Sequence, residues 1–218
     1  MTVSDYNPPT RYSGTPHRFA LPAETILWRL HSRKIPATSF VPYTPTSHGR
    51  FDAPPDDQYG KCDAGTDAAA MLADTLLRAV PPDSTACRTI RRAAVVGQRA
   101  SAIVTASELQ LVSLLDAPAL AAVAQSRWLV SAEWADFPKV RRWAKWIREQ
   151  APWAQGFIWP TVRNEHEQLV IMFADRCDPA VLEPDPLFEV DLDDDYGAVW
   201  LNGVMVRYRA RINPPRKK

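Results

Sequence analysis

The chain has 218 residues, of which 46% are hydrophobic and 23% are charged. This length and composition are typical of one globular domain with a substantial core, and they exclude a disordered chain. The 26 basic and 25 acidic residues leave a net charge of +1, so no overall field attracts the protein to nucleic acid or to an anionic membrane. No apolar run reaches the roughly 18 residues that span a bilayer, and the N-terminus lacks a signal-peptide pattern. We therefore expect a cytoplasmic protein that binds neither a membrane nor nucleic acid directly.

Residues 1–23 are rich in Pro, Ser, Thr and Tyr and show no hydrophobic period, which predicts an extended N-terminal arm. We assign residues 24–180 to the main folded domain and residues 181–218 to a C-terminal extension that packs on the same domain. Within this extension, two apolar runs flank Asn202 and Gly203. Because this pair of residues is typical of a two-residue turn, the extension is predicted to contain a β-hairpin.

Strands and helices are expected to alternate between these ends. Strands are predicted at residues 25–30, 93–97, 101–105, 109–115, 156–159 and 168–173, and helices at residues 67–79, from 117 onward and at 138–150. The basic residues and tryptophans of the last helix could contact nucleic acid, but a solvated basic face over buried tryptophans explains them better. Because there is neither a regular βαβ rhythm nor a Gly-rich phosphate loop, we predict an α+β fold with irregular sheets.

Metal and disulfide chemistry have little support in the sequence. The three cysteines, Cys62, Cys87 and Cys177, are widely spaced, and the four histidines show no ligand spacing. The acidic run at residues 191–195 lacks the spaced ligands of a calcium loop and is interpreted as a solvated turn. We predict no metal site.

Two arginines stand in unusual places. Arg29 lies in the middle of the strand-like run at residues 25–30, where a permanent charge must meet an anion or reach solvent. A phosphate contact and a buried ion pair explain it equally well. Arg50 follows Gly49, which would allow the backbone to approach a ligand closely, although an ordinary turn has the same pattern.

Two further candidates carry an acid and a hydroxyl. Asp74 interrupts an apolar helical segment, and an ion pair with Arg78 four residues later would account for it without any function. Thr161 follows a predicted strand and lies close to Arg163. Its hydroxyl could contact a ligand or could close a turn.

In their order and spacing, these segments resemble the RES domain, a family named for its Arg, Glu and Ser. The matching pieces are LWRL at 27–30, GRFD at 49–52, Tyr59, ADTLLR at 73–78, GFIWPTVR at 156–163 and IMFADR at 171–176. The resemblance covers residues 24–178. It implies an ADP-ribosyltransferase-like fold, with a split sheet, flanking helices and NAD held in a cleft between two small sheets.

The resemblance also implies a function. RES proteins are typically toxins of toxin–antitoxin pairs that cleave the nicotinamide–ribose bond of NAD by hydrolysis or phosphorolysis. NAD is then a substrate, and the usual partner is an antitoxin with a helix-turn-helix domain that blocks the active site.

The family's site residues can be carried over to matching positions. The expected catalytic residues are Arg29, Asp74 and Thr161, and the expected NAD-binding residues are Arg29, Arg50, Tyr59, Thr161 and Arg163. Arginines suit a pyrophosphate because their guanidinium groups form forked, charge-assisted hydrogen bonds. Tyr59 could stack on nicotinamide, and Asp74 could stabilise the positive charge that develops as nicotinamide leaves.

The sequence departs from the family at two of these positions. Asp74 stands where the motif has Glu, and Thr161 stands where it has Ser. Threonine keeps the hydroxyl, but aspartate is shorter by one C–C bond of about 1.5 Å, and misplacement on that scale can cost on the order of 100-fold in rate. Two alternatives therefore remain open: transfer of ADP-ribose to a macromolecule, and a catalytically degenerate module that binds a nucleotide or a protein partner.

Overall fold

The computed structural model describes residues 7–46, 49–78, 80, 86–162 and 164–215. The strands are β1 (Arg18–Leu21), β2 (Ile26–Ser32), β3 (Lys61–Gly65), β4 (Arg88–Ile90), β5 (Gln98–Val104), β6 (Leu109–Ser113), β7 (Gly156–Pro160), β8 (Gln168–Phe173), β9 (Phe188–Asp191) and β10 (Ala210–Ile212). The helices are α1 (Ala68–Leu76), α2 (Ala117–Ala121), α3 (Trp128–Ser131), α4 (Phe137–Gln150) and α5 (Asp195–Met205), with short 3-10 turns η2 (Arg92–Ala94), η3 (Trp134–Asp136) and η4 (Val206–Tyr208).

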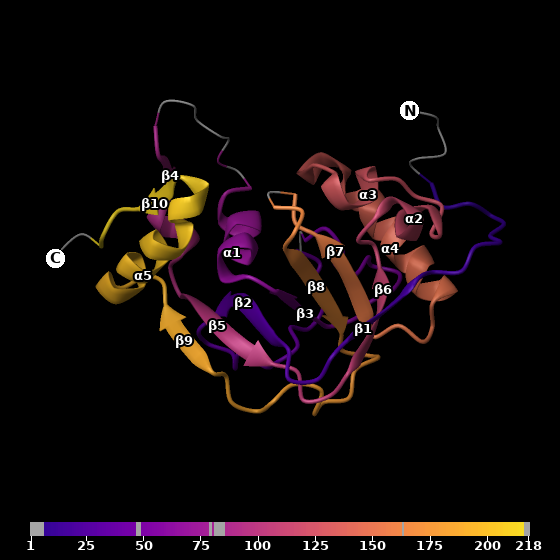
Figure 1. Cartoon of the computed structure of the whole chain (residues 1–218), viewed down its shortest axis with the longest axis horizontal. Helices are drawn as coiled ribbons and strands as arrows, with labels where there is room; N and C mark the ends of the chain where they lie inside the picture. Colours follow the sequence, from indigo (N-terminus) through magenta and orange to yellow (C-terminus); the bar gives the residue numbers. More distant parts are fainter. Residues whose placement is uncertain (1–6, 47–48, 79, 81–85, 163, 216–218) are drawn as a thin grey trace.

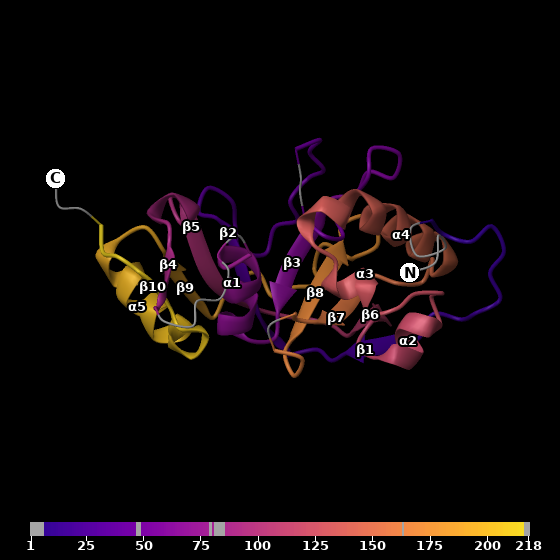
Figure 2. The same cartoon turned by 90° about the horizontal axis from the view of Figure 1, so that it is seen from above.

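Eight strands form one mixed sheet in the order β1-β6-β7-β8-β3-β2-β5-β9, and β10 and β4 form a separate parallel pair. The large sheet is split in its middle, because β2 and β3 pair only at Trp28 and Gly65. A Cβ atom on Gly65 would lie 2.9 Å from that of Met71, so glycine allows this close approach. Helices α1 and α5 lie over one half of the sheet, and α2, α3 and α4 lie beside the other half (Figures 1 and 2). The predicted α+β fold with a split sheet and flanking helices is confirmed.

Local signals place most of the helices where the sequence predicts them. The side chain of Asp67 accepts a hydrogen bond of 2.8 Å from the Ala70 amide at the start of α1, and Asp116 caps α2 through Ala119 at the same distance. Helix α4 buries Trp143 with its other apolar residues, as its amphipathic pattern predicts. In the described part of the chain, each helix is too short or too polar to span a bilayer.

The predicted C-terminal β-hairpin is wrong, because its first arm and the turn are part of helix α5. The Asp194 side chain caps this helix by accepting a hydrogen bond from the Gly197 amide. Leu201 and Met205 are buried at helical spacing, and this burial outweighs the local turn signal. Asn202, which was expected in the turn, instead forms hydrogen bonds through its side chain with both backbone groups of Ile212.

Two smaller predictions also need correction. Residues 93–97 are not a strand: the chain forms η2 and then a turn in which Gly97 has a φ of 67°. The Gly97 amide donates a hydrogen bond of 2.8 Å to the carboxylate of Asp193, which fixes this turn. Part of the predicted N-terminal arm belongs to the sheet, because residues 18–21 form β1, which pairs with β6 at the edge of the sheet, while residues 1–6 lie outside the described residues.

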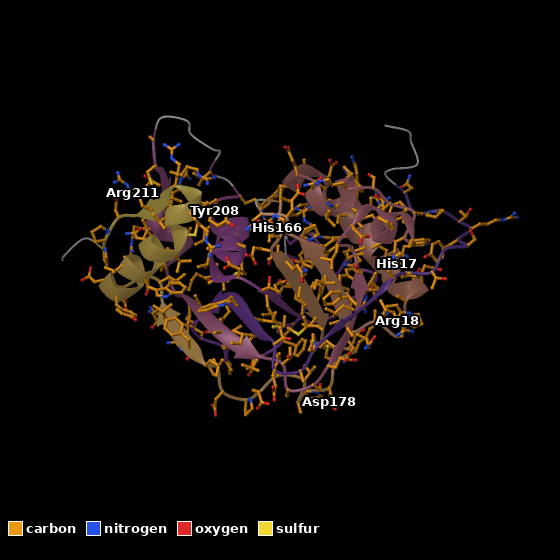
Figure 3. The ribbon with its side chains drawn as sticks, in the orientation of Figure 1. His17, Arg18, His166, Asp178, Tyr208 and Arg211 are labelled. Atoms are coloured by element: carbon orange, nitrogen blue, oxygen red, sulfur yellow. The ribbon has the colours of Figure 1, made fainter. Side chains whose placement is uncertain are left out.

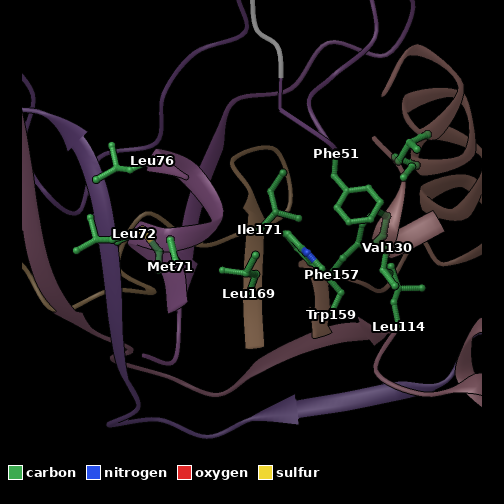
Figure 4. Close-up of a cluster of buried hydrophobic side chains, with 14 of the residues drawn as sticks. Phe51, Met71, Leu72, Leu76, Leu114, Val130, Phe157, Trp159, Leu169 and Ile171 are labelled. Carbon is green, nitrogen blue, oxygen red and sulfur yellow. The ribbon is translucent and has the colours of Figure 1, made fainter. Parts of the chain in front are cut away.

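The main core lies between the sheet and the helices. Phe51 packs edge-on against Trp159, with ring centroids 4.7 Å apart, and against Phe157 at 5.5 Å. Figure 4 shows this group facing Leu72 and Met71 of α1 across the middle of the molecule. A second cluster, which includes Leu27 of β2, covers the other face of the sheet. Apolar clusters therefore lie on both faces of the sheet.

Candidate functional site

Two cavities lie where the halves of the molecule meet, one of about 630 Å³ and one of about 220 Å³. Arg50, Asp74 and Arg78 line both of them. The larger cavity falls within the usual range for ligand pockets, roughly 300–1,000 Å³. The shared residues make the two cavities neighbouring parts of one candidate site.

The larger cavity is rich in arginine. One wall comes from the end of α1 and from Arg88 of β4, and the opposite wall comes from residues 131–134 and Phe137. Arg50, Arg78 and Arg88 face two carboxylates, those of Asp74 and Glu133, so the lining has an excess of positive charge. Such a lining suits a ligand with phosphate groups.

The smaller cavity has a larger apolar share than the first, although Arg50, Asp74 and Arg78 line it too. Its lining includes Leu30, Phe51, Met71, Trp159, Leu169 and Val170. Lys61 and Asp63 also line it, with their charged atoms 2.6 Å apart, and Lys61 contacts Asp52 as well. Burial acts to lower the pKa of Lys61, but Asp63 and Asp52 outweigh it and raise this pKa above its usual value. The ammonium group of Lys61 is thus paired with carboxylates of the protein. The apolar part of the wall, which includes Phe51 and Trp159, suits a flat, weakly polar ring.

Asp74 lies at the boundary between the two cavities. Helix α1 directs it there, while Leu72 and Ala73 on other sides of the helix are fully buried. Its carboxylate is 3.2 Å from the guanidinium of Arg78, the ion pair that the spacing of four residues predicts. Because Asp74 also lines both cavities, this ion pair does not exclude a functional role.

Arg50 is buried beside Asp74. Its Nη1 donates a hydrogen bond of 2.9 Å to the Ala132 carbonyl, and its guanidinium carbon lies 5.0 Å from the centroid of the Phe137 ring. Burial lowers the pKa of Arg50 to about 10, while the charge of Asp74 acts in the opposite direction. Arg50 remains positive at neutral pH, and it presents a fixed charge to the cavity.

Arg29 lines neither cavity. Strand side chains alternate between faces, and Leu30 faces the smaller cavity, so Arg29 points to the opposite face of the sheet. Its Nη1 donates hydrogen bonds to the carbonyls of Ala37 and Ser39. Backbone carbonyls therefore contact this buried charge, and within the described residues no carboxylate pairs with it.

Tyr59 also lies in the core and lines neither cavity. Its hydroxyl donates a hydrogen bond of 2.7 Å to the Phe51 carbonyl, and its ring packs edge-on against Phe173. The guanidinium carbon of Arg148 lies 3.9 Å from the ring centroid, and burial raises the pKa of the hydroxyl. These contacts occupy both the ring and the hydroxyl of Tyr59.

Thr161 lies at the end of β7 and is buried. Its hydroxyl accepts a hydrogen bond from the Asn164 amide and donates one to the Asn164 carbonyl, both at 2.9 Å. This is the turn hydroxyl that the sequence left open as an alternative. The next residue, Val162, lines the larger cavity, whereas Arg163 lies outside the described residues.

The structure adds several cavity residues that the sequence did not suggest. Arg88, Glu133, Trp134 and Tyr208 line the larger cavity, and they come from segments without a recognisable motif. Trp159 lines the smaller cavity, and only its place in the matching piece at residues 156–163 indicated a role at the site. Across the part of the chain that the structure describes, no group of three metal-ligating side chains is positioned to hold an ion.

Comparison with known proteins identifies the kind of domain. A protein-family model described as the RES domain matches residues 26–198. Among solved structures, a chain in the crystal structure of the M. tuberculosis MbcT–MbcA toxin–antitoxin complex is similar, with a TM-score of 0.56 and 16% identity. The alignment covers 86% of this chain and 92% of that chain, and at this identity it shows a shared fold. A search of curated proteins finds no match.

Proposed function

Because this chain belongs to the RES domain family, we propose that it is the toxin of a toxin–antitoxin pair and that it cleaves the bond between nicotinamide and ribose in NAD. The observation that carries the proposal is the position of Asp74 on the lining shared by two cavities, of which the larger adds Arg88 and the smaller adds an apolar wall with Phe51 and Trp159. NAD has the matching form, since a pyrophosphate lies between its adenosine half and its nicotinamide riboside half. The proposed setting is the cytoplasm, with a helix-turn-helix antitoxin as the partner.

In this proposal the nicotinamide ring enters the smaller cavity, against Trp159 and Phe51. The pyrophosphate lies in the larger cavity near Arg50 and Arg78. The arginines would neutralise the charge of the pyrophosphate. The apolar side chains of the smaller cavity would exclude water from the nicotinamide ring. The nicotinamide–ribose bond then lies close to Asp74.

The chemistry assigned to Asp74 is electrostatic. As the C–N bond breaks, its electron pair leaves with the nicotinamide nitrogen, and positive charge develops on the ribose. The carboxylate of Asp74 would stabilise this charge and accept a hydrogen bond from a ribose hydroxyl. An oxygen of water or phosphate then forms the new bond to the ribose carbon, and the proton that water loses goes to solvent.

The test is incubation of the full chain with NAD, with and without phosphate, while free nicotinamide is measured by chromatography. We expect release from the wild type and a loss of about 100-fold or more in Asp74→Asn, because the developing charge loses its counter-ion. Asp185→Asn is the matched control, since Asp185 is exposed and lines neither cavity. A dependence on phosphate would identify phosphorolysis.

Other results would contradict the proposal. Full activity in Asp74→Asn would remove Asp74 from the reaction. NAD bound by the folded wild type without nicotinamide release would indicate a binding module. Transfer of label from tagged NAD to a macromolecule would indicate an ADP-ribosyltransferase.

A further inference from the structure

The smaller cavity lies where the two halves of the sheet separate. Strands β2 and β3 pair only at Trp28 and Gly65. If this antiparallel register continued, Leu30 would lie opposite Asp63, but that pair does not form, and both residues line the cavity instead. Because side chains alternate along a strand, Lys61 faces the same side of β3 as Asp63, and it lines the same cavity. The split of the sheet thus places a cation and an anion side by side in the cavity.

These two charges differ in how far the protein itself satisfies them. The Nζ of Lys61 lies 2.6 Å from Oδ2 of Asp63 and also contacts the carboxylate of Asp52. The side chains of Lys61 and Asp52 are 17% and 3% exposed, whereas that of Asp63 is 53% exposed. Since Asp52 alone neutralises Lys61, the carboxylate of Asp63 adds a surplus negative charge. Within the described residues, its Oδ1 accepts no hydrogen bond, so this oxygen can meet a ligand.

A primary carboxamide is the chemical group that matches this pair. It carries a carbonyl oxygen, which accepts, next to an NH2 group, which donates. An ammonium group has three donors, and two of those on Lys61 contact carboxylates, so the third can reach the carbonyl oxygen. The Oδ1 of Asp63 can accept from the NH2 group. A carboxylate in place of the amide offers Asp63 no donor and carries a charge of the same sign, which repels it.

We infer that Lys61 and Asp63 bind the carboxamide of the pyridine ring and make the site selective for nicotinamide over nicotinic acid. The inference rests on the proposed function, because that function places the nicotinamide ring in this cavity. The ring would then pack against Met71, Leu169 and Trp159, which line the same cavity and are labelled in Figure 4. Asp63 is the residue that determines the selectivity, because it supplies the acceptor for the amide and the repulsion of the acid.

Two arginines also line the smaller cavity, but they belong to its phosphate side. Arg50 and Arg78 line the larger cavity as well, whereas Lys61 and Asp63 line only the smaller one. Arg78 forms its ion pair with Asp74 at 3.2 Å. A group held by Lys61 and Asp63 therefore lies at the end of the site away from the larger cavity, where a ring carboxylate would meet the surplus charge of Asp63.

The test measures dissociation constants of free pyridines for the full chain by ligand-observed NMR, which requires no turnover. The probes are nicotinamide, nicotinate and 3-acetylpyridine, which keeps the carbonyl oxygen but has a methyl group in place of the NH2 group. We expect nicotinamide to bind at least about tenfold more tightly than each of the other two, because both lose a hydrogen bond to a charged group. This comparison uses the wild type alone, so it does not depend on the stability of a variant.

The variant Asp63→Asn removes the surplus charge and keeps the size of the side chain. We expect its preference for nicotinamide over nicotinate to fall to about threefold or less, because the repulsion is lost. Its melting temperature should change by only about 2 °C, since Asp63 is half exposed. Asp178→Asn is the matched control, because Asp178 is exposed and lines neither cavity. Figure 3 shows Asp178 at the lower edge of the molecule, apart from Tyr208 of the larger cavity.

Turnover separates this inference from the proposed function. With NAD and nicotinic acid adenine dinucleotide as substrates, we expect kcat/KM for release of the base to be at least about tenfold higher for NAD. If the wild type releases no base but prefers free nicotinamide through Asp63, the proposed function fails and the carboxamide site stands. If both dinucleotides are cleaved equally well, the proposed function stands and the carboxamide site fails.

Three binding results would also overturn the carboxamide site. One is no binding of nicotinamide to the wild type, and another is equal binding of nicotinamide and nicotinate. The third is a wild-type preference in folded Asp63→Asn. A loss of the preference in Asp178→Asn to the same degree would assign it to the net charge of the protein, and this result would likewise remove Asp63 from the recognition of the ring.

Discussion

The carboxylate of Asp74 lies 3.2 Å from the guanidinium of Arg78, and both residues line both cavities. Partly exposed ion pairs at this helical spacing contribute little to stability, roughly 0.3–0.5 kcal/mol. The main effect of the contact is therefore to orient the Asp74 carboxylate at the boundary between the cavities. Arg78 thus orients Asp74 in addition to its proposed place beside the pyrophosphate.

We predict that Arg78→Met lowers kcat/KM for nicotinamide release by about tenfold or more, because the variant loses a hydrogen bond to a charged group. The melting temperature should change by only about 2 °C, since little stability depends on the pair. Arg142→Met is the control, because Arg142 is an exposed arginine of α4. Unchanged kcat/KM together with a large loss of stability would show that the pair is structural.

Replacing Asp74 with the family's glutamate tests the cost of the shorter side chain. Asp74 faces open space in both cavities, so one more methylene can be accommodated. We expect Asp74→Glu to raise the rate of nicotinamide release, by up to about 100-fold if the carboxylate is misplaced by one bond length. The measurement is kcat at saturating NAD. A rate at or below that of the wild type would mean that the backbone already compensates for the shorter side chain.

Arg29 is predicted to stabilise the folded protein. Its guanidinium satisfies the carbonyls of Ala37 and Ser39, and Arg29→Met would leave both without their donor. Hydrogen bonds to charged groups contribute about 1.5–3 kcal/mol each. We therefore expect the free energy of unfolding to fall by about 3 kcal/mol or more and the melting temperature to fall by about 6–12 °C. The KM for NAD should stay near that of the wild type in the folded fraction. Lost turnover at an unchanged melting temperature would place Arg29 in catalysis, as the family resemblance implies.

Local sequence signals predicted much of the fold. The caps at Asp67 and Asp116 and the amphipathic pattern of residues 138–150 each depend on neighbours within a few positions, so the sequence contains all the information needed. The turn signal at Asn202 and Gly203 is also local, but it is overruled. There the cap at Asp194 and the burial of one helix face against the rest of the domain favour a helix.

The candidate site was only partly predictable, because tertiary packing assembles it. Arg50 and Asp74 were identified from their unusual positions, and the structure brings them together. Arg88 and Glu133 belong to distant segments whose sequences give no sign of a shared cavity. Arg29 shows the opposite case: a charge in a strand indicates that a partner is required, but the sequence does not show that backbone carbonyls supply it.

His31 makes the stability of the fold depend on pH. Its Nε2 lies 2.8 Å from Ser101 Oγ, and its Nδ1 lies 3.0 Å from the Ser32 carbonyl oxygen. Burial lowers the pKa of His31 below its usual 6.5, although the Ser32 carbonyl acts in the opposite direction. The unfolded chain therefore binds more protons than the folded protein just below pH 6.5. The stabilising contribution of neutral His31 is complete above that pH and is lost as the pH falls through the lower, folded-state pKa.

We predict that the urea concentration at the unfolding midpoint of the wild type decreases as the pH is lowered from about 7.5 to about 5.5. In His31→Gln this decrease should be smaller. Glutamine can donate and accept the same hydrogen bonds but does not titrate in this range. His166→Gln is the matched control, because His166 is exposed, and it should keep the wild-type dependence on pH. Equal slopes in the wild type and His31→Gln would assign the pH dependence to other groups, whereas a shallower slope in His31→Gln alone would identify His31 as the titrating group.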